Sequence, residues 1–289
     1  MAEKVIIIGG TAAGLSAASK AKRVDPSLDI TVFEKSGYIS YGACGLPYFV
    51  GDMIKEPNDL VSLSVDQMTH KRGVPTFIHH EVTRIDRGAQ TVTVRNLDNG
   101  EVIERPYDKL VIATGARPIV PRIPGTDAKG VYTLRTVEDG IRLKSVVQSG
   151  AQKKAAIIGG GFIGIEVAEE LTTSGVEVHL FEMMPRLLPF LTESFSEAVL
   201  DTLTQHGVHV HLNAGVQALM TAEGSVCGVR ATDGSETPVD YALLSIGVVP
   251  ASDLARDAGL ELGLKGAIVV DDEMRTSDPR IWACGDCVQ

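Results

Sequence analysis

The chain contains one pattern twice, and this internal repeat constrains its fold more than any other feature. In each copy, a short apolar run leads into a glycine-rich loop, and a helical stretch and a second apolar run follow. The first copy runs from residues 5–8 to Glu34, and the second runs from residues 155–158 to Glu182. A strand, a glycine loop, a helix and a strand that ends at an acid form a dinucleotide-binding unit. The sequence therefore predicts two such units in tandem.

The repeat continues after the second strand of each copy. Residues 91–104 read as a β-hairpin, and residues 110–115 read as a further buried strand that ends at a glycine. Residues 226–247 repeat this plan in the second copy. The tail from residue 266 onward has no counterpart there, so we expect it to return to the first unit as a strand.

These elements predict an α/β fold with two Rossmann-like dinucleotide-binding domains, each built in three layers (ββα). The first domain is expected to combine residues 1–118 with residues 249–289, and the second is expected to span residues 119–248. A proline-rich stretch at residues 118–124 marks a crossing between them.

Charge and hydropathy restrict the partners of the chain. It has 27 basic and 37 acidic residues, a formal net charge of −10, which argues against nonspecific binding of nucleic acid. No apolar run approaches the roughly 20 residues of a membrane helix. The first apolar run is also too short for the core of a signal peptide, so we expect a cytoplasmic protein without membrane contact.

The two glycine loops indicate sites for a pyrophosphate. In a Gly-x-Gly-x-x-Gly loop, backbone N–H groups approach the phosphates at a helix N-terminus, where the helix dipole favours negative charge. Gly159, Gly161 and Gly164 match this pattern fully, whereas the first loop has Gly9 and Gly14 with a threonine at the middle position.

An acid ends the second strand of each copy. Glu34 and Glu182 stand where a carboxylate accepts hydrogen bonds from the ribose hydroxyls of an adenosine, and the alternative is a solvated acid at a strand end. Because a carboxylate repels a 2′-phosphate, Glu182 favours NADH over NADPH, although Arg186 lies close enough to weaken this argument.

Cys44 is a candidate reactive thiol, because it lies between glycines in a loop just after the first strand–helix–strand unit. A buried structural cysteine is the alternative. No second cysteine stands at redox-pair spacing, so a redox-active Cys44 must work alone, through a mixed disulfide, a persulfide or a sulfenic acid.

Two other groups of residues are interpreted as structural or binding elements. The Cys284-x-x-Cys287 pair lacks the second pair of a zinc site, and we interpret Asp286 within it as a carboxylate for a polyol hydroxyl. The seven histidines show no metal-ligand spacing, so no metal site is expected.

Together these residues resemble the FAD-dependent pyridine nucleotide–disulfide oxidoreductases over essentially the whole chain. The matching motifs are the first glycine loop with Glu34, Ala113-Thr114-Gly115, the second loop with Glu166 and Glu182, Gly247 with Pro250, and Trp282-Ala283-Cys284-Gly285-Asp286. The segment Ser40-x-x-x-Cys44-Gly45-Leu46-Pro47-Tyr48 is similar to the single-cysteine branch of coenzyme A–disulfide reductases and NADH-dependent persulfide or polysulfide reductases. It is less similar to NADH oxidases and peroxidases.

The resemblance implies a role for each set of residues, with Cys44 as the catalytic thiol. The implied FAD contacts are Gly9, Ala13, Gly14, Glu34, Lys35, Val82, Ala113, Thr114, Gly115 and Asp286. The implied NAD contacts are Gly159, Gly161, Phe162, Ile163, Gly164, Glu182 and Gly247. Because Phe162 follows Gly161 at the mouth of the second loop, we expect it to cover the flavin until NADH binds, and a packing residue is the alternative. The implied coenzyme A contacts are Ser16, Lys20, Arg23, Ser40 and Arg72, while Ala43 departs from the asparagine usual beside the cysteine.

The implied activity is reduction of CoA disulfide, CoA persulfide or polysulfide by NADH through FAD. The alternatives are an NADH oxidase or peroxidase that cycles Cys44 through sulfenic acid, and a binding module without turnover. Members of the family continue past the last motif into a dimerisation domain, and some carry a rhodanese domain. We therefore expect this chain to be a C-terminally truncated piece of a homodimeric enzyme, with its dimerisation domain absent.

Overall fold

The computed structural model describes residues 2–289, which divide into two compact units. Unit 1 comprises the described residues up to Gly42 together with Val61–Arg117 and Val249–Gln289, and unit 2 comprises Ala43–Leu60 and Pro118–Val248. The chain passes from one unit to the other within β8 (Ala116–Pro118) and again within β17 (Val248–Pro250), and these two strands pair as a two-stranded sheet.

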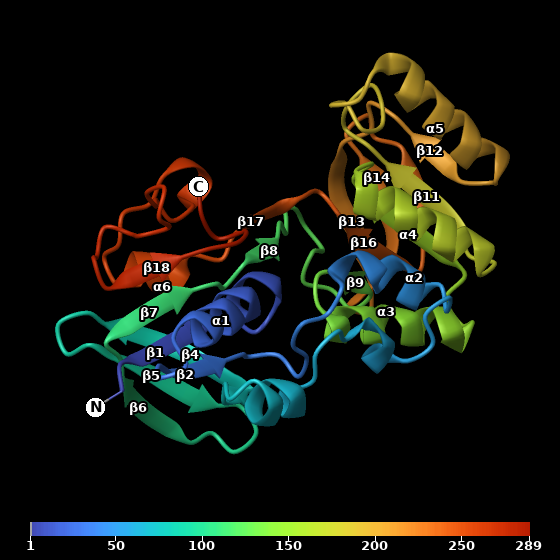
Figure 1. Ribbon diagram of the computed structural model, residues 1–289. Helices are drawn as coiled ribbons and strands as arrows, with labels where there is room; N and C mark the ends of the chain where they lie inside the picture. Colours follow the sequence, from blue (N-terminus) through green and yellow to red (C-terminus); the bar gives the residue numbers. More distant parts are fainter. Residues whose placement is uncertain (1) are drawn as a thin grey trace. The chain divides into compact units, whose positions relative to one another are not determined.

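A five-stranded parallel sheet forms the centre of unit 1 (Figure 1). Its strands, in spatial order, are β18 (Ile281–Ala283), β7 (Lys109–Ile112), β1 (Lys4–Ile8), β2 (Asp29–Phe33) and β3 (Thr76–Phe77). Since β18 comes from the end of the chain and pairs with β7, the predicted return of the tail to the first unit is confirmed.

Strand alternation places one apolar row on each face of this sheet. Val5 and Ile7 pack on the side of α1 (Ala12–Val24). Ile6 and Ile8 pack on the other side, against an antiparallel sheet of β4 (His80–Asp86), β5 (Thr91–Asn96) and β6 (Val102–Pro106). The helix, parallel sheet and antiparallel sheet are the three predicted layers. The remaining helical elements of unit 1 are η3 (Gln67–Lys71), α6 (Asp253–Asp257) and η4 (Leu264–Gly266).

Unit 2 repeats this plan. Its parallel sheet has the spatial order β12 (His209–His211), β11 (Glu177–Phe181), β10 (Lys154–Ile158), β16 (Tyr241–Leu244) and β9 (Val131–Tyr132). One face carries the antiparallel strands β13 (Val216–Ala222), β14 (Ser225–Ala231) and β15 (Glu236–Pro238), while α4 (Phe162–Thr173) packs on β10 and β11. The helices α3 (Val137–Ser149) and α5 (Glu193–Gln205) complete the unit.

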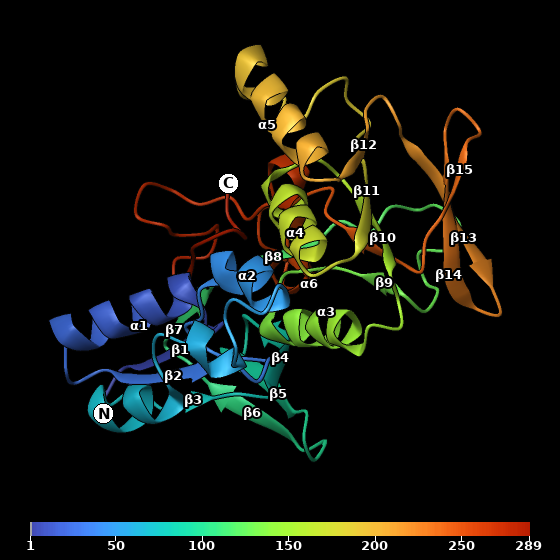
Figure 2. The same cartoon turned by 90° about the vertical axis from the view of Figure 1, so that its right-hand side faces the viewer.

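The segment after the first strand–helix–strand unit differs from the expected domain boundaries. The sequence places residues 43–60 in the first domain, but the structure groups them with unit 2. Within them, η1 (Ala43–Gly45), α2 (Leu46–Val50) and η2 (Pro57–Leu60) follow one another, and α2 lies beside α3 and α4 (Figure 2). Gly140 of α3 allows this approach, because a Cβ there would lie 3.1 Å from the Phe49 ring.

The predicted hairpins and the predicted α/β class are confirmed in both units. Among the described residues, no helix is both long and apolar enough to span a membrane.

Candidate active site

The first glycine loop closes tightly between β1 and α1. Gly9 has a φ of +112°, and a Cβ at this position would overlap the carbonyl oxygen of Ala113. A Cβ at Gly14 would overlap the carbonyl oxygen of Gly9. Both positions therefore require glycine, and the turn brings the start of α1 close to the end of β7.

The second loop has the same construction. Gly159 has a φ of +111°, and a Cβ there would lie 2.7 Å from the carbonyl oxygen of Ser245. A Cβ at Gly164 would overlap the carbonyl oxygen of Gly159. A Cβ at Gly161, by contrast, would meet no atom within 4 Å, so the backbone at the start of α4 faces open space. A pyrophosphate fits such an open backbone surface.

The acid at the end of each second strand is oriented by two backbone N–H groups. Glu34 accepts hydrogen bonds from Gly10 at 2.6 Å and from Ser36 at 2.8 Å. Glu182 accepts the equivalent bonds from Gly160 at 2.7 Å and Met184 at 2.8 Å. In each glutamate, one N–H group binds Oε1 and the other binds Oε2, so each oxygen keeps a lone pair that can accept a hydrogen bond from a hydroxyl group.

The C-terminal motif of unit 1 lies against the first glycine loop. A Cβ at Gly285 would lie 2.8 Å from the Cβ of Ala13, so this turn contacts the first turn of α1. Thr114 donates a hydrogen bond of 2.6 Å from its Oγ1 to the carbonyl of Ala251. Asp286 is exposed beside this turn. The other predicted FAD contacts, Lys35, Val82 and Gly115, belong to the same unit.

Cys44 is an exposed thiol within η1. The cysteines of the Cys-x-x-Cys motif are different, because burial raises the pKa of the thiols of Cys284 and Cys287. Protonated thiols are poor nucleophiles, which agrees with the interpretation of that motif as structural.

Lys144 of α3 fixes the chain after Cys44, although no pattern in the sequence distinguishes this lysine. Its side chain is only 7% exposed, and its ammonium lies 2.9 Å from Asp52. It also donates hydrogen bonds to the carbonyl groups of Ile54 and Lys55 at 2.9 and 2.8 Å. The same ammonium lies 4.2 Å from the centroid of the Phe49 ring. A residue far along the chain thereby holds the segment that carries the thiol.

The predicted coenzyme A residues of unit 1 gather around α1. Ser16, Lys20 and Arg23 are exposed and lie three or four residues apart, so they share one face of the helix. Arg72 joins them from the end of η3, since its Nη1 donates a 2.8 Å hydrogen bond to Ser19. Ser40 has a φ of 48° and donates its N–H to the carbonyl of Gly10 at 2.9 Å.

The predicted NAD residues lie at the carboxyl ends of the strands of unit 2. Phe162 and Ile163 are exposed at the start of α4, and Phe162 packs against Phe190 with ring centroids 5.3 Å apart. Gly247 has a φ of +106° just after β16.

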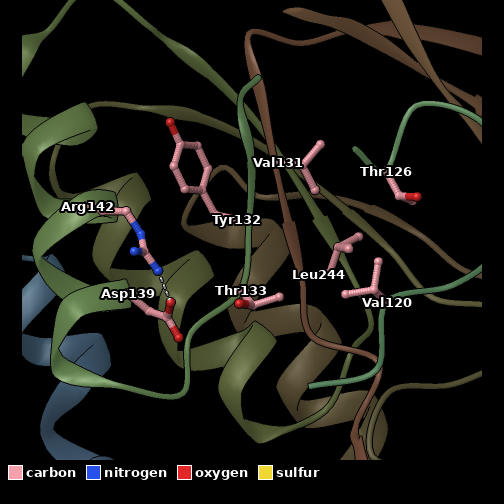
Figure 3. A pocket seen from close by; sticks show the side chains of 8 residues that line it. All are labelled: Val120, Thr126, Val131, Tyr132, Thr133, Asp139, Arg142 and Leu244. Atoms are coloured by element: carbon pink, nitrogen blue, oxygen red, sulfur yellow. Dashed lines mark hydrogen bonds and ion pairs between the residues drawn. The ribbon is translucent and has the colours of Figure 1, made fainter. Parts of the chain in front are cut away.

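Figure 3 shows a separate cavity of about 270 Å³ in unit 2, with the Asp139–Arg142 ion pair on one side of it and Val120 and Leu244 on another. It contains none of the predicted NAD contacts. Its lining residues are Val120, Thr126, Val131, Tyr132, Thr133, Asp139, Arg142 and Leu244.

Comparison with known proteins gives a match over nearly the whole chain. The profile described as "Pyridine nucleotide-disulphide oxidoreductase" matches residues 3–289. The chain belongs to this family. Members of this family are NAD(P)H-dependent flavoproteins.

Individual relatives carry different names. A protein of Methanocaldococcus jannaschii named "NADH oxidase" is 36% identical over 99% of this chain and 63% of its own length. A protein of Pyrococcus horikoshii named "NAD(P)H coenzyme A polysulfide/persulfide reductase" is 35% identical over 100% of this chain and 63% of its own. The solved structure of an NAD-dependent persulfide reductase from A. fulgidus has a TM-score of 0.93 and 40% identity, covering 99% of this chain and 53% of that one. The chain therefore spans less than two thirds of these relatives.

Proposed function

We propose that this chain forms the FAD- and NADH-binding part of an NADH-dependent reductase that acts on CoA disulfide, CoA persulfide or polysulfide. The observation that carries the proposal is the exposed thiol of Cys44, which has no second cysteine at redox-pair spacing in the sequence. A disulfide reductase with one thiol must form a mixed disulfide or a persulfide with its substrate.

The residues of unit 1 fit FAD. The tight turn at Gly9 and Gly14 positions the N-terminus of α1, whose unpaired N–H groups suit a pyrophosphate, and Glu34 has acceptor capacity for ribose hydroxyls. When bound, FAD supplies the two-electron chemistry that connects a nicotinamide to a sulfur acceptor. In unit 2, Gly161 and Glu182 offer the same two functions to NADH.

The proposed reaction at Cys44 balances as follows for CoA disulfide. The thiolate attacks one sulfur of the disulfide, the S–S bond breaks, and one CoA thiolate leaves and is protonated. Cys44 is then oxidised in a mixed disulfide with the second CoA. Two electrons that originate in NADH reduce this mixed disulfide, which releases the second CoA thiol and restores the Cys44 thiolate. Overall, CoA disulfide, NADH and a proton yield two CoA thiols and NAD⁺.

The names of relatives support two candidate acceptors. The persulfide reductases from P. horikoshii and A. fulgidus support a sulfur acceptor, and the latter is 40% identical to the chain over the matched region. The M. jannaschii relative named NADH oxidase supports oxygen as an acceptor. In that case O2, NADH and a proton would convert the Cys44 thiol into a sulfenic acid and release water and NAD⁺. Both acceptors require the same cysteine.

A comparison of Cys44→Ser with Cys227→Ser tests the proposal in the complete natural protein. Cys227 is the other exposed cysteine, so it controls for loss of a surface thiol. Under anaerobic conditions, we expect NADH to bleach the flavin of all three proteins. CoA disulfide should restore the flavin spectrum of the wild type and of Cys227→Ser, but not of Cys44→Ser.

The other outcomes contradict specific parts of the proposal. Turnover that survives in Cys44→Ser would eliminate the thiol as the redox centre. Faster consumption of oxygen than of sulfur acceptors would identify an oxidase, and absence of flavin bleaching would identify a binding module. The homodimer expected from the family resemblance and the cytoplasmic location expected from the hydropathy pattern stay predictions.

A further inference from the structure

An acid and two imidazoles of unit 2 converge at the edge of its parallel sheet. Glu177 and His179 are two residues apart on β11, so both side chains project from one face. His209 on β12 is the direct neighbour of His179 in the register. One ligand atom from each of these three residues lies within 4.8 Å of the others.

The closest pairs within this cluster are short. Nε2 of His179 lies 3.0 Å from Oε1 of Glu177. The rings of His179 and His209 stack with their centroids 4.7 Å apart. Glu177 and His209 are exposed, and the side chain of His179 is 13% exposed, so the cluster lies at the protein surface.

The internal repeat shows that the fold does not require these side chains. In unit 1, Phe33 pairs with Phe77 in the same way that Phe181 pairs with His211 in unit 2. His179 and His209 lie two residues before Phe181 and His211. The residues two before Phe33 and Phe77 are Thr31 and Pro75, which therefore occupy the corresponding positions of unit 1. The same sheet edge therefore forms in unit 1 without imidazoles.

We propose that Glu177, His179 and His209 bind a divalent transition-metal ion of the Zn²⁺ type. Two imidazole nitrogens and one carboxylate oxygen are the ligands that Zn²⁺, Co²⁺ and Ni²⁺ accept, whereas Mg²⁺ and Ca²⁺ select oxygen ligands. Three protein ligands leave the fourth tetrahedral position to water. The ligands come from two strands, so a bound ion ties the edge strand β12 to β11.

His211 is placed to orient His179 for this purpose. Its Nε2 lies 3.2 Å from Nδ1 of His179, so it accepts the Nδ1–H of His179 when the metal occupies Nε2. The ring of His211 is itself fixed by stacking on Phe181, with centroids 4.5 Å apart. His211 is therefore a positioning residue, not a ligand.

Lys154 competes with the metal for the carboxylate. Its Nζ lies 3.0 Å from the same Oε1 of Glu177, and its side chain is 46% exposed. An exposed ion pair of this kind has little net stability, so a dication displaces the ammonium at small cost.

Titration of the untagged chain with Co²⁺ and Zn²⁺ tests the proposal. We expect one Co²⁺ per chain with the visible absorption of a four-coordinate site, displaced by Zn²⁺, and a thermal midpoint that rises with metal concentration. His179→Thr, which copies Thr31 of unit 1, and Glu177→Gln should each weaken binding by about tenfold or more. Lys154→Met should strengthen it.

The control is His206→Ala, which removes an exposed imidazole at the end of α5 outside the cluster and should leave binding unchanged. The thermal midpoint of each variant without metal separates loss of ligands from loss of folding, and Glu177→Gln retains the shape of the side chain if His179→Thr unfolds. Wild-type affinity in both His179→Thr and Glu177→Gln would overturn the proposal, as would absence of stoichiometric binding to the wild type.

Discussion

The ammonium of Lys144 lies 2.9 Å from the carboxylate of Asp52, although Val61–Arg117 of unit 1 separates their two stretches in the sequence. Through this pair and two backbone carbonyls, α3 holds the segment that carries Cys44. The position of this segment therefore depends on a lysine from a distant part of the sequence.

Lys144→Met should loosen this segment. Methionine keeps much of the apolar stem but leaves the carbonyl groups of Ile54 and Lys55 without their charged donor, at a cost of about 2–3 kcal/mol. We expect a lower thermal midpoint, and faster hydrogen exchange in residues 46–60 than elsewhere in unit 2. Lys55→Met is the matched control, because Lys55 contacts the same Asp52 with a side chain that is 68% exposed. Equal effects of the two variants would contradict the role of Lys144.

The pH dependence of stability should report the same contact. The hydrogen bond from Lys55 and then that from Lys144 lower the pKa of Asp52 from 3.8 to about 2. A carboxyl group with a lowered folded pKa contributes stability above its unfolded pKa, and this contribution is lost as the pH falls through the folded pKa. The urea midpoint of the wild type should thus exceed that of Asp52→Asn by a constant amount above pH 5. The difference should shrink between pH 4 and pH 2. A difference that stays constant down to pH 2 would show that Asp52 is not stabilised by these lysines.

The two glycines of the second loop should respond differently to alanine. Gly159→Ala places a Cβ at a φ of +111° and 2.7 Å from a carbonyl oxygen, so it should destabilise unit 2 by about 1–3 kcal/mol or more. Gly161→Ala meets no atom within 4 Å and should fold normally, as the threonine at the matching position of the first loop does. Its methyl group should instead weaken NADH binding by about three- to tenfold, because it stands where the pyrophosphate approaches the backbone. Thermal melting and NADH titration separate these effects. Unchanged NADH affinity in Gly161→Ala would place the pyrophosphate elsewhere.

The repeat explains how much of this molecule could be predicted from its sequence. Glycine loops, strand alternation and hairpin turns are local signals, so they predict both three-layer units and the oriented acids Glu34 and Glu182. The assignment of residues 43–60 to unit 2 has no local signal, because it depends on the packing of α2 against Gly140 and on Lys144. The cluster at His179 was missed for a similar reason. Glu177 and His179 are alternate residues of β11, and His209 lies on β12. Only the register of β11 and β12 brings the three side chains together.

Glu182 should determine the preference for NADH. Its carboxylate is fixed by Gly160 and Met184, so it cannot turn away from a 2′-phosphate without losing both hydrogen bonds. Like-charge repulsion of about 1–3 kcal/mol corresponds to a ten- to hundredfold preference for NADH. Glu182→Gln keeps the shape of the side chain and removes its charge, so it should reduce the preference for NADH over NADPH, as should Glu182→Ala. The ratio of the dissociation constants for NADPH and NADH measures this preference. Equal wild-type affinities for the two cofactors would contradict the prediction.

We predict that the basic residues around α1 bind the phosphates of coenzyme A. Lys20 and Arg23 share a face of the helix, and Arg72 is held to the neighbouring Ser19, so three positive charges are available for the phosphates of CoA. CoA should protect Cys44 from alkylation by iodoacetamide, and protection should weaken at higher salt. Arg23→Ala combined with Arg72→Ala should require about tenfold more CoA for the same protection and leave NADH binding unchanged. Arg84→Ala, which removes an exposed arginine on β4 of the same unit, is the control. Absence of protection in the wild type, or wild-type protection in the double variant, would exclude these arginines as the CoA site and favour polysulfide or oxygen as the acceptor.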